Sequence, residues 1–384
     1  MIAWIRYICL IVSLIITLPE LLSAQRLVSQ RQEDVEAGLL YNESVYILSN
    51  YSCLSSNSPE KLSLDELLRK QIEGFYFYLK RDTETNVLLL RKPDGTFTPF
   101  SESLKAIKVA LDADPDKVMT LFLDFYVETE LESSFKEIGL MEYVLEYDTK
   151  NGWPSLKNML SSGKRLVVFE VQKHLNSPSW LHNMRDFVEH TDADWGNQPE
   201  GVESFDERLK KNLSLFTGYK FLETSRGNSN DISALARQTP YLIESFKRAW
   251  IRDGRVPNFV LVDKYYAWLD VSLVTFRNFD IIYGAVTNNN ELLNYVNWDG
   301  MSNYTTGKYC FPLEPGAELM LSPISPGYRI EPATVYVSGT QRKAFAGDFK
   351  ARPLRIDEDI EIYLPFEGDE KDGSSNHNLT VSRN

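Results

Sequence analysis

Continuous apolar runs that alternate with helix-forming stretches are the feature that most constrains the fold of this chain. Thr120-Leu121-Phe122-Leu123 and Phe259-Val260-Leu261-Val262 are continuous rather than alternating. Such runs predict strands that are buried on both faces, as in a parallel sheet. Further strands are expected at residues 45–51, 74–80, 87–91, 165–171, 219–224 and 281–286.

Helical patterns lie between these runs. In residues 101–113, Leu104, Ile107 and Leu111 fall on one face of a helix. Other helices are expected at 62–73, 179–190 and 231–252. This alternation predicts an α/β fold, a (β/α) TIM-type barrel over residues 30–297. An open doubly wound sheet is the alternative, although no glycine-rich phosphate loop follows any strand.

The sequence changes character near Trp298, where prolines and glycines become frequent and apolar residues fall into short groups such as Ala333–Val337. This pattern predicts a β-rich C-terminal extension, with a linker or small domain at residues 298–354. A last segment follows at 355–384.

The N-terminus has the layout of a secretory signal peptide. Arg6 precedes an apolar run from Ile8 to Leu18, and Ala24 supplies a small residue for cleavage. The run is shorter than the roughly 20 residues that span a bilayer. Residues 1–24 are therefore predicted to be removed and the protein to be secreted, with an uncleaved anchor as the alternative.

Secretion bears on the cysteines and on glycosylation. Cys53 and Cys310 remain after cleavage. The alternatives are that they form one disulfide or that they are two buried thiols. Triplets of the form N-x-S/T, which are glycan acceptors in a eukaryote, begin at Asn42, Asn50, Asn212, Asn303 and Asn378.

The charge balance excludes one class of partner. The chain has 41 Lys and Arg residues against 54 Asp and Glu residues, for a net charge of −13. Such a chain lacks the basic patch of a nucleic-acid binder. It also has no long-range attraction to an anionic lipid surface, so peripheral contact with a membrane is left open.

Histidine is scarce, with four residues in the chain and none before His174. His182 and His190 lie eight residues apart on the helix predicted at 179–190, with Asp186 between them. We expect exposed polar positions rather than a metal site there. His174 follows a strand and is expected to be a loop residue, with a catalytic role as the alternative.

Several segments together resemble a known family. Trp153-Pro154-Ser155-Leu156 with the following 163–169, and the stretches 120–127, 221–225 and 256–265, are similar to phosphatidylinositol-specific phospholipase C X-domain-like proteins. The similarity runs from about Tyr41 to Phe279. It implies a phosphodiesterase TIM barrel with its site at the C-terminal ends of the strands. It also implies phosphoric diester hydrolysis by two histidines, one acting as base and one as acid.

Both histidines are replaced in this chain. Tyr51 stands at the base position, followed by Ser52 in place of an asparagine, and Arg91 stands at the acid position. Tyr78 replaces a family aspartate, whereas Asp124 and Asp263 keep acidic character. Tyrosine titrates near 10, and arginine does not release its proton. The sequence thus leaves no confident catalytic residue, and whether the chain is an enzyme stays open.

Two functions follow as hypotheses. The first is a non-catalytic binding module for a small sugar, a phosphorylated inositol-type ligand or a surface partner, with Asp124, Asp263, Arg91 and Tyr78 as candidate ligand-binding residues. The second is an active phosphoric diester hydrolase on a lipid or glycerophosphodiester, with altered catalytic residues. No cofactor is expected. The family resemblance implies Ca²⁺ in some members, and Asp124 is the candidate ligand here if any metal binds.

The end of the chain resembles the opening of a laminin-G or concanavalin-like domain. The resemblance rests on residues 360–369, with Tyr363, Phe366 and Gly368, and on the turn at 372–377. A jelly roll needs about eight strands, so the segment 355–384 is expected to be an incomplete domain.

Overall fold

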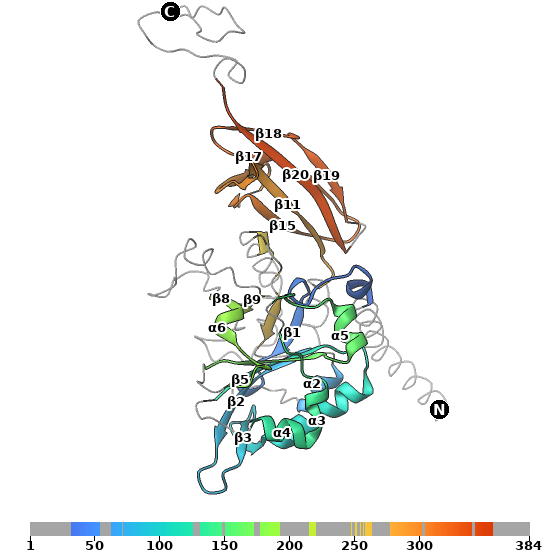
Figure 1. The fold of residues 1–384 in the computed structure, drawn as a ribbon, viewed down its shortest axis with the longest axis vertical. Coiled ribbons are helices and arrows are strands. Elements are labelled where there is room, and N and C mark those ends of the chain that lie inside the picture. The colour runs from blue at the N-terminus through green and yellow to red at the C-terminus, as the bar shows by residue number, and fades with distance from the viewer. Residues whose placement is uncertain are drawn as a thin grey trace, which may run out of the picture. The chain divides into compact units, whose positions relative to one another are not determined.

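The computed structural model describes fifteen stretches of the chain (Figure 1): residues 32–53, 63–70, 72–125, 131–147, 150–172, 177–192, 215–219, 247, 250–251, 254, 256, 258–262, 277–301, 304–339 and 342–355. The chain divides into two compact units, Met1–Phe246 with Val256–Phe279, and Lys247–Arg255 with Asp280–Asn384. The predicted signal peptide and nearly all of the predicted laminin-G-like segment lie outside the described residues. In the described part, no helix is long and apolar enough to cross a membrane.

Eight parallel strands build the first unit. Their order is β7-β6-β5-β2-β1-β10-β9-β8, so β1 pairs in parallel with both β2 and β10. The last of these strands along the chain, β10, thus pairs with the first, β1. The predicted (β/α) barrel is confirmed. The strands are β1 Tyr46–Ser49, β2 Gly74–Arg81, β5 Met119–Asp124, β6 Leu166–Glu170, β7 Leu181–Asn183, β8 Val188–Asp192, β9 Leu215–Tyr219 and β10 Phe259–Val262.

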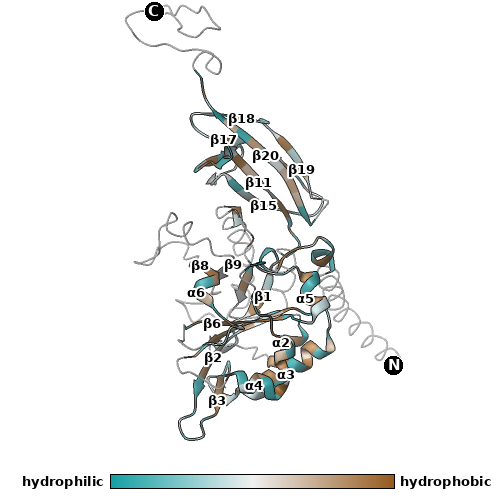
Figure 2. Cartoon of the chain, viewed as in Figure 1, coloured by the Kyte–Doolittle hydropathy of each residue, from teal (hydrophilic) through white to brown (hydrophobic). Residues whose placement is uncertain are grey.

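The helices of this unit pack on the outside of the strands. They are α2 Leu64–Arg69, α3 Phe100–Ala113, α4 Leu131–Ile138, α5 Leu156–Ser162 and α6 Met184–Phe187. Ser63 begins α2 with a capping box in which its hydroxyl accepts from the Glu66 amide. In α3 the buried face includes Leu104, Ile107 and Leu111, as predicted. Figure 2 shows apolar and polar residues side by side on α3 and α4, as expected for helices with one buried face.

Two predicted elements differ from the structure. Residues 179–190 were expected to form one helix, but they form β7, the short α6 and β8. Bulky and β-branched residues such as Trp180, Leu181 and Val188 are buried there, and tertiary packing outweighs the helical spacing. The strand expected at 87–91 is β3 (Leu88–Arg91), which pairs antiparallel with β2 and with β4 (Phe97–Pro99). It therefore extends β2 as a hairpin rather than joining the barrel.

Aromatic rings fill the barrel interior. Phe122 stacks on Phe169 at 5.1 Å between ring centroids and meets Phe259 edge-on at 5.2 Å. At the start of β2, position 74 must be a glycine, because a Cβ there would lie 2.2 Å from the carbonyl oxygen of Thr120 on β5. Between β5, β6 and β10 the interior of the barrel is therefore a packed core.

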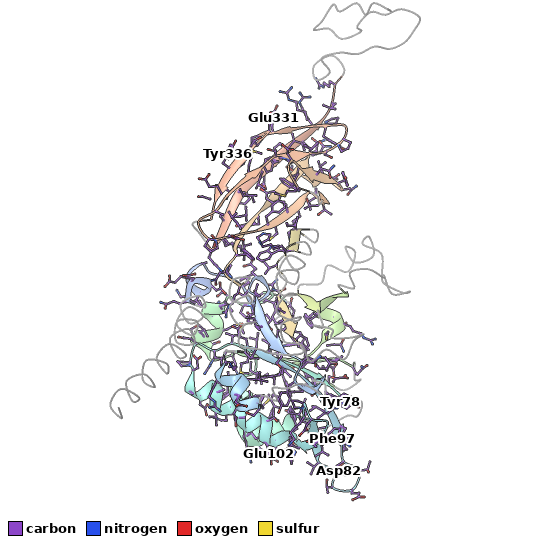
Figure 3. The ribbon with its side chains drawn as sticks, turned by 180° about the vertical axis from the view of Figure 1, so that it is seen from behind. Tyr78, Asp82, Phe97, Glu102, Glu331 and Tyr336 are labelled. Atoms are coloured by element: carbon purple, nitrogen blue, oxygen red, sulfur yellow. The ribbon has the colours of Figure 1, made fainter. Side chains whose placement is uncertain are left out.

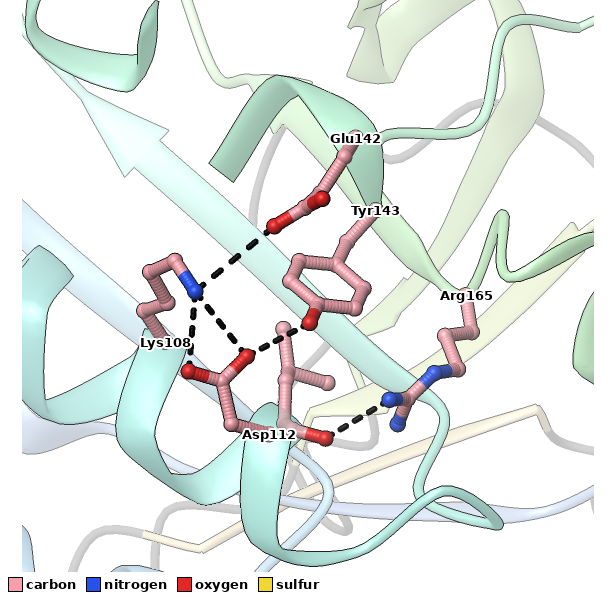
Figure 4. A network of polar contacts seen from close by, with 6 residues as sticks. Lys108, Asp112, Glu142, Tyr143 and Arg165 are labelled. Carbon is pink, nitrogen blue, oxygen red and sulfur yellow. Dashed lines mark hydrogen bonds and ion pairs between the residues drawn. The ribbon is translucent and has the colours of Figure 1, made fainter. Parts of the chain in front are cut away.

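A polar network closes the N-terminal end of the barrel (Figure 4). Arg165, just before β6, donates to the carbonyl oxygens of Leu111, Asp114 and Lys117 at 2.6–3.0 Å. These bonds satisfy carbonyl groups at the C-terminal end of α3. Nearby, Asp112 accepts from Tyr143 at 2.5 Å and pairs with Lys108 at 2.8 Å. The Gly-Lys-Arg part of the family resemblance thus has a structural role, away from the end where barrel sites form.

The second unit is built of short strands. They are β11 Asp280–Asn288, β12 Glu291–Leu292, β13 Val296–Trp298, β14 Tyr304–Thr305, β15 Lys308–Leu313, β16 Glu318–Leu321, β17 Pro323–Ile324, β18 Tyr328–Glu331, β19 Val335–Ser338 and β20 Lys343–Pro353. The buried Trp298 packs edge-on against Tyr309, Phe311 and Phe349 in its core. The predicted β-rich extension is present.

The boundary between the units differs from the prediction. It falls at Phe279/Asp280 rather than at 297/298, because β11 pairs with β15 and β20 of the second unit and not with a barrel strand. Residues 247–255 also belong to the second unit, where the buried indole of Trp250 donates to the sulfur of Cys310 at 3.0 Å. Cys310 is buried, and the Cys53 side chain lies outside the described residues.

His182 gives the barrel a dependence on pH. Its ring is 4% exposed among Trp153, Phe169 and Phe187, and Nε2 hydrogen-bonds the carbonyl oxygen of Leu145 at 3.1 Å. Burial lowers the pKa of His182 below its ordinary value of 6.5. Below that value the unfolded chain binds a proton that the folded chain does not.

We therefore expect the free energy of unfolding to fall as the pH drops below 6.5, by up to about 1.4 kcal/mol per pH unit from this group. Urea unfolding at pH 7.5 and 5.5 measures the effect. His182→Gln, which keeps a donor for Leu145 but does not titrate, should be less sensitive to this change. Equal sensitivity in the variant would contradict the assignment to His182.

Candidate functional site

The C-terminal ends of β2 and β5 bring a carboxylate and two tyrosines to one face of the sheet. Phe122 faces the interior, so alternation places Asp124 on the same face, two residues further along β5. Asp124 is in register with Tyr78, and Phe122 with Tyr76. The hydroxyl of Tyr76 donates to Asp124 Oδ2 at 2.7 Å. Asp124 Oδ1 is buried and has no hydrogen-bond partner among the described residues.

Tyr51, at the family's base position, lies on the other face of β2. It begins the 3₁₀ turn Tyr51–Cys53, and its ring is edge-on to Phe75 at 6.4 Å and to Phe77 at 5.8 Å. Phe77 in turn meets Phe100 of α3, so this is the helix-facing side of the strand. Burial, with the charges of Asp94 and Asp65, raises the pKa of Tyr51 to about 12. The raised pKa and the packing against Phe75 and Phe77 both argue against a role for Tyr51 as a base.

Ser52 joins the other two positions of the family pattern. Its hydroxyl oxygen accepts from the Tyr78 amide at 2.7 Å and donates to the Arg91 carbonyl at 3.1 Å. The Ser52 side chain thus bridges the backbone of Tyr78 and of Arg91. The Arg91 side chain is exposed on the hairpin. Figure 3 shows Tyr78 at the end of the barrel from which this hairpin projects, with Asp82 near its tip.

Other candidates are untested or excluded. Asp263 and His174 lie outside the described residues. His182 and His190 lie on β7 and β8 rather than on a helix, and His182 is buried, so the prediction of two exposed helical histidines is wrong. Asn50 is 2% exposed, which excludes it as a glycan acceptor in the folded chain. Within the described ranges, no group of three or more His, Cys, Asp or Glu residues could hold a metal ion.

Two roles in this region were not predicted from the sequence. One is that of Tyr76 as the hydrogen-bond donor to Asp124. The other is that of Glu170, the last residue of β6, which is 1% exposed and accepts from Ser177 at 2.6 Å and from Asn183 at 3.2 Å. The sequence signal for Glu170 was its position as an acidic residue directly after the apolar run Leu166–Phe169. It faces away from Phe169, because neighbouring residues of a strand alternate.

The described groups at these strand ends can bind hydroxyl groups. Asp124 is an acceptor when ionised, Tyr76 is a donor, and Tyr78 adds an aromatic ring on the same face. A base and an acid with pKa values near the working pH are what general acid–base catalysis requires. Neither Tyr51 nor Arg91 meets that requirement.

Comparison with known proteins identifies part of the chain. The family model PI-PLC X 1 matches residues 90–199. No curated protein matches the sequence. Among solved structures, a phosphatidylinositol-specific phospholipase C mutant from Staphylococcus aureus is similar, with 14% identity over 64% of this chain and 96% of that chain and a TM-score of 0.41. The enzyme from Listeria monocytogenes is similar at 13% identity, over 64% and 98%, with a TM-score of 0.40. Over residues 90–199 the chain is thus similar to the PI-PLC X domain, and this match falls within the barrel unit.

Proposed function

We propose that the barrel of this chain is a non-catalytic PI-PLC X-like domain that binds a small polyhydroxylated ligand, a sugar or an inositol headgroup. The observation that carries the proposal is the placement of Tyr51. Its ring packs against Phe75 and Phe77 on the helix-facing side of β2, and its pKa is raised to about 12. A base must instead be within reach of the substrate proton and titrate near the working pH.

Binding is supported by the polar groups at the C-terminal ends of β2 and β5. Asp124 Oδ1 is buried without a hydrogen-bond partner among the described residues, and a buried carboxylate oxygen in that state is costly. A ligand hydroxyl would satisfy it. Tyr78 offers a ring face against which the apolar face of a sugar or inositol can pack. The exposed Arg91 adds positive charge for a phosphorylated form of the ligand.

Secretion is part of the same proposal. It is supported by the signal-peptide pattern of residues 1–24, with its short apolar run and Ala24. The alternative function, an active phosphoric diester hydrolase, is favoured by one observation. Asp124 lies at the strand end where barrel enzymes place functional groups, and it already holds a tyrosine hydroxyl.

Binding and turnover measured on one sample separate the two. We expect the full chain to bind myo-inositol or a simple sugar by calorimetry and to release no inositol phosphate from phosphatidylinositol. Asp124→Asn should weaken the binding about tenfold, because it removes the charge that strengthens a hydrogen bond to the ligand hydroxyl. Glu132→Gln, an exposed change on α4, is the matched control. Turnover that Asp124→Asn abolishes would favour the hydrolase instead.

A further inference from the structure

The second unit contains a hollow of about 400 Å³. It is lined by the turn between β11 and β12, by the segment leading into β13, and by the connection between β17 and β18. The volume is within the range of small-molecule sites, about 300–1,000 Å³. All lining residues belong to the second unit, so the hollow is separate from the barrel site.

Hydrogen bonds and backbone geometry fix the walls of this hollow. Asn289 and Asn290 have φ values of 51° and 68° and form a two-residue turn, with Asn288 directly opposite Glu291. On the other side, the Ser325 hydroxyl donates to the Tyr295 carbonyl oxygen at 2.8 Å. The two walls are thereby joined, and the hollow does not depend on a loose loop.

Two tyrosines present rings that their own contacts hold in place. Tyr295 is 41% exposed, yet its hydroxyl donates to Asn297 at 2.9 Å. Tyr328 is half-buried and packs against the aromatic core of the unit. A ring that is exposed but already oriented loses little conformational entropy when a ligand stacks on it.

The polar groups of the hollow are suited to a neutral ligand. In the described part of the chain, no side-chain hydrogen bond engages Asn288, Asn294 or Glu291, all of which line the hollow. Amides donate and accept, and a carboxylate accepts, which is the combination that a polyol requires. None of the described residues lining the hollow is a lysine or arginine. A phosphate or sulfate would find no counter-charge there and would face Glu291.

We infer that this hollow is a carbohydrate-binding site for a neutral glycan, with one sugar ring stacked on Tyr295 and its hydroxyls bonded to Asn288, Asn294 and Glu291. The site would bind the second unit to a glycosylated surface. This inference does not depend on the function proposed for the barrel.

A glycan array probed with the full chain tests the inference, using neutral oligosaccharides of glucose, galactose, mannose and N-acetylglucosamine beside sialylated and sulfated glycans. We expect binding to one neutral group. The tightest glycan is then titrated by calorimetry. Tyr295→Ala should lower its affinity about tenfold, as the loss of one aromatic stacking contact does. Glu291→Gln should lower the affinity severalfold.

Matched controls come from the same unit. Tyr336 on β19 is 76% exposed, and Glu331 on β18 is also exposed; both are outside the hollow (Figure 3). Tyr336→Ala and Glu331→Gln should bind as the unmodified chain does. Binding restricted to acidic glycans, no binding to any glycan, or an unchanged affinity in Tyr295→Ala would overturn the inference. Binding lost in Asp124→Asn but kept in Tyr295→Ala would assign the sugar to the barrel.

Discussion

Incubated with phosphatidylinositol, the full chain should release less than about 10⁻⁴ of the inositol phosphate that an active bacterial phosphatidylinositol-specific phospholipase C releases, with or without calcium. A positioned acid or base contributes about 10²–10⁴-fold, and neither Tyr51 nor Arg91 fills the role of the family histidine that it replaces. Tyr51 has a pKa of about 12 and packs on Phe75 and Phe77. An arginine side chain does not give up its proton, so it cannot replace the acid. The measurement is release of soluble inositol phosphate, with the active enzyme as the positive control.

Restoring the histidines should not restore the activity. Tyr51→His/Arg91→His replaces both residue types, but the side chain at position 51 lies on the helix-facing side of β2, where it meets Phe75 and Phe77. We expect the double variant to gain less than about tenfold, below the contribution of one positioned group. Turnover by the unmodified chain within about a hundredfold of that of the active enzyme would contradict the non-catalytic proposal. A large gain in the double variant would show that the site is intact apart from these two residues.

Much of the barrel could be predicted because its strands are buried on both faces. The runs at 120–123 and 259–262 became β5 and β10, and the apolar face of 101–113 became the buried face of α3. Residues 281–286 carry the same apolar signal, yet they belong to β11 of the second unit. The local sequence pattern indicates that a strand is buried, but not in which of the two cores. The core is decided by pairing, and β11 pairs with β20 residues that lie about sixty positions further along the chain.

The site was only partly predictable for a related reason. The family positions Ser52, Tyr78 and Arg91 lie together because the Ser52 hydroxyl bridges the backbone of β2 and of the hairpin strand β3. The resemblance could not assign the face on which Tyr51 lies, since that residue is in a 3₁₀ turn after β1 rather than within the strand. Tyr76 was missed as the donor to Asp124 because strand alternation alone does not tell which face is the interior.

Breaking the ion pair between Glu73 and Arg277 should destabilise the first unit by about 3–5 kcal/mol, as removal of one partner of a buried pair does. Glu73 lies just before β2. Its Oε1 lies 3.1 Å from Arg277 Nη2, and the two side chains are 9% and 2% exposed. Its Oε2 accepts from the Ile47 amide of β1 at 3.2 Å. Glu73→Gln keeps the shape but removes the negative charge that lies 3.1 Å from the buried Arg277 guanidinium.

Urea unfolding of Glu73→Gln at pH 7.5 gives the measurement. Glu132→Gln, which breaks the exposed pair with Lys136 on α4, is the control and should cost less than about 1 kcal/mol. The double change Glu73→Leu/Arg277→Met should recover much of the loss, because it removes both charges from the interior and keeps their volume. If Glu73→Gln lowers the free energy of unfolding no more than Glu132→Gln does, water or other groups already screen Arg277. If the double variant is instead as unstable as the single one, the Glu73 bond to Ile47 matters more than the charge pair, and the carboxylate holds β1 and β2 together chiefly as a hydrogen-bond acceptor.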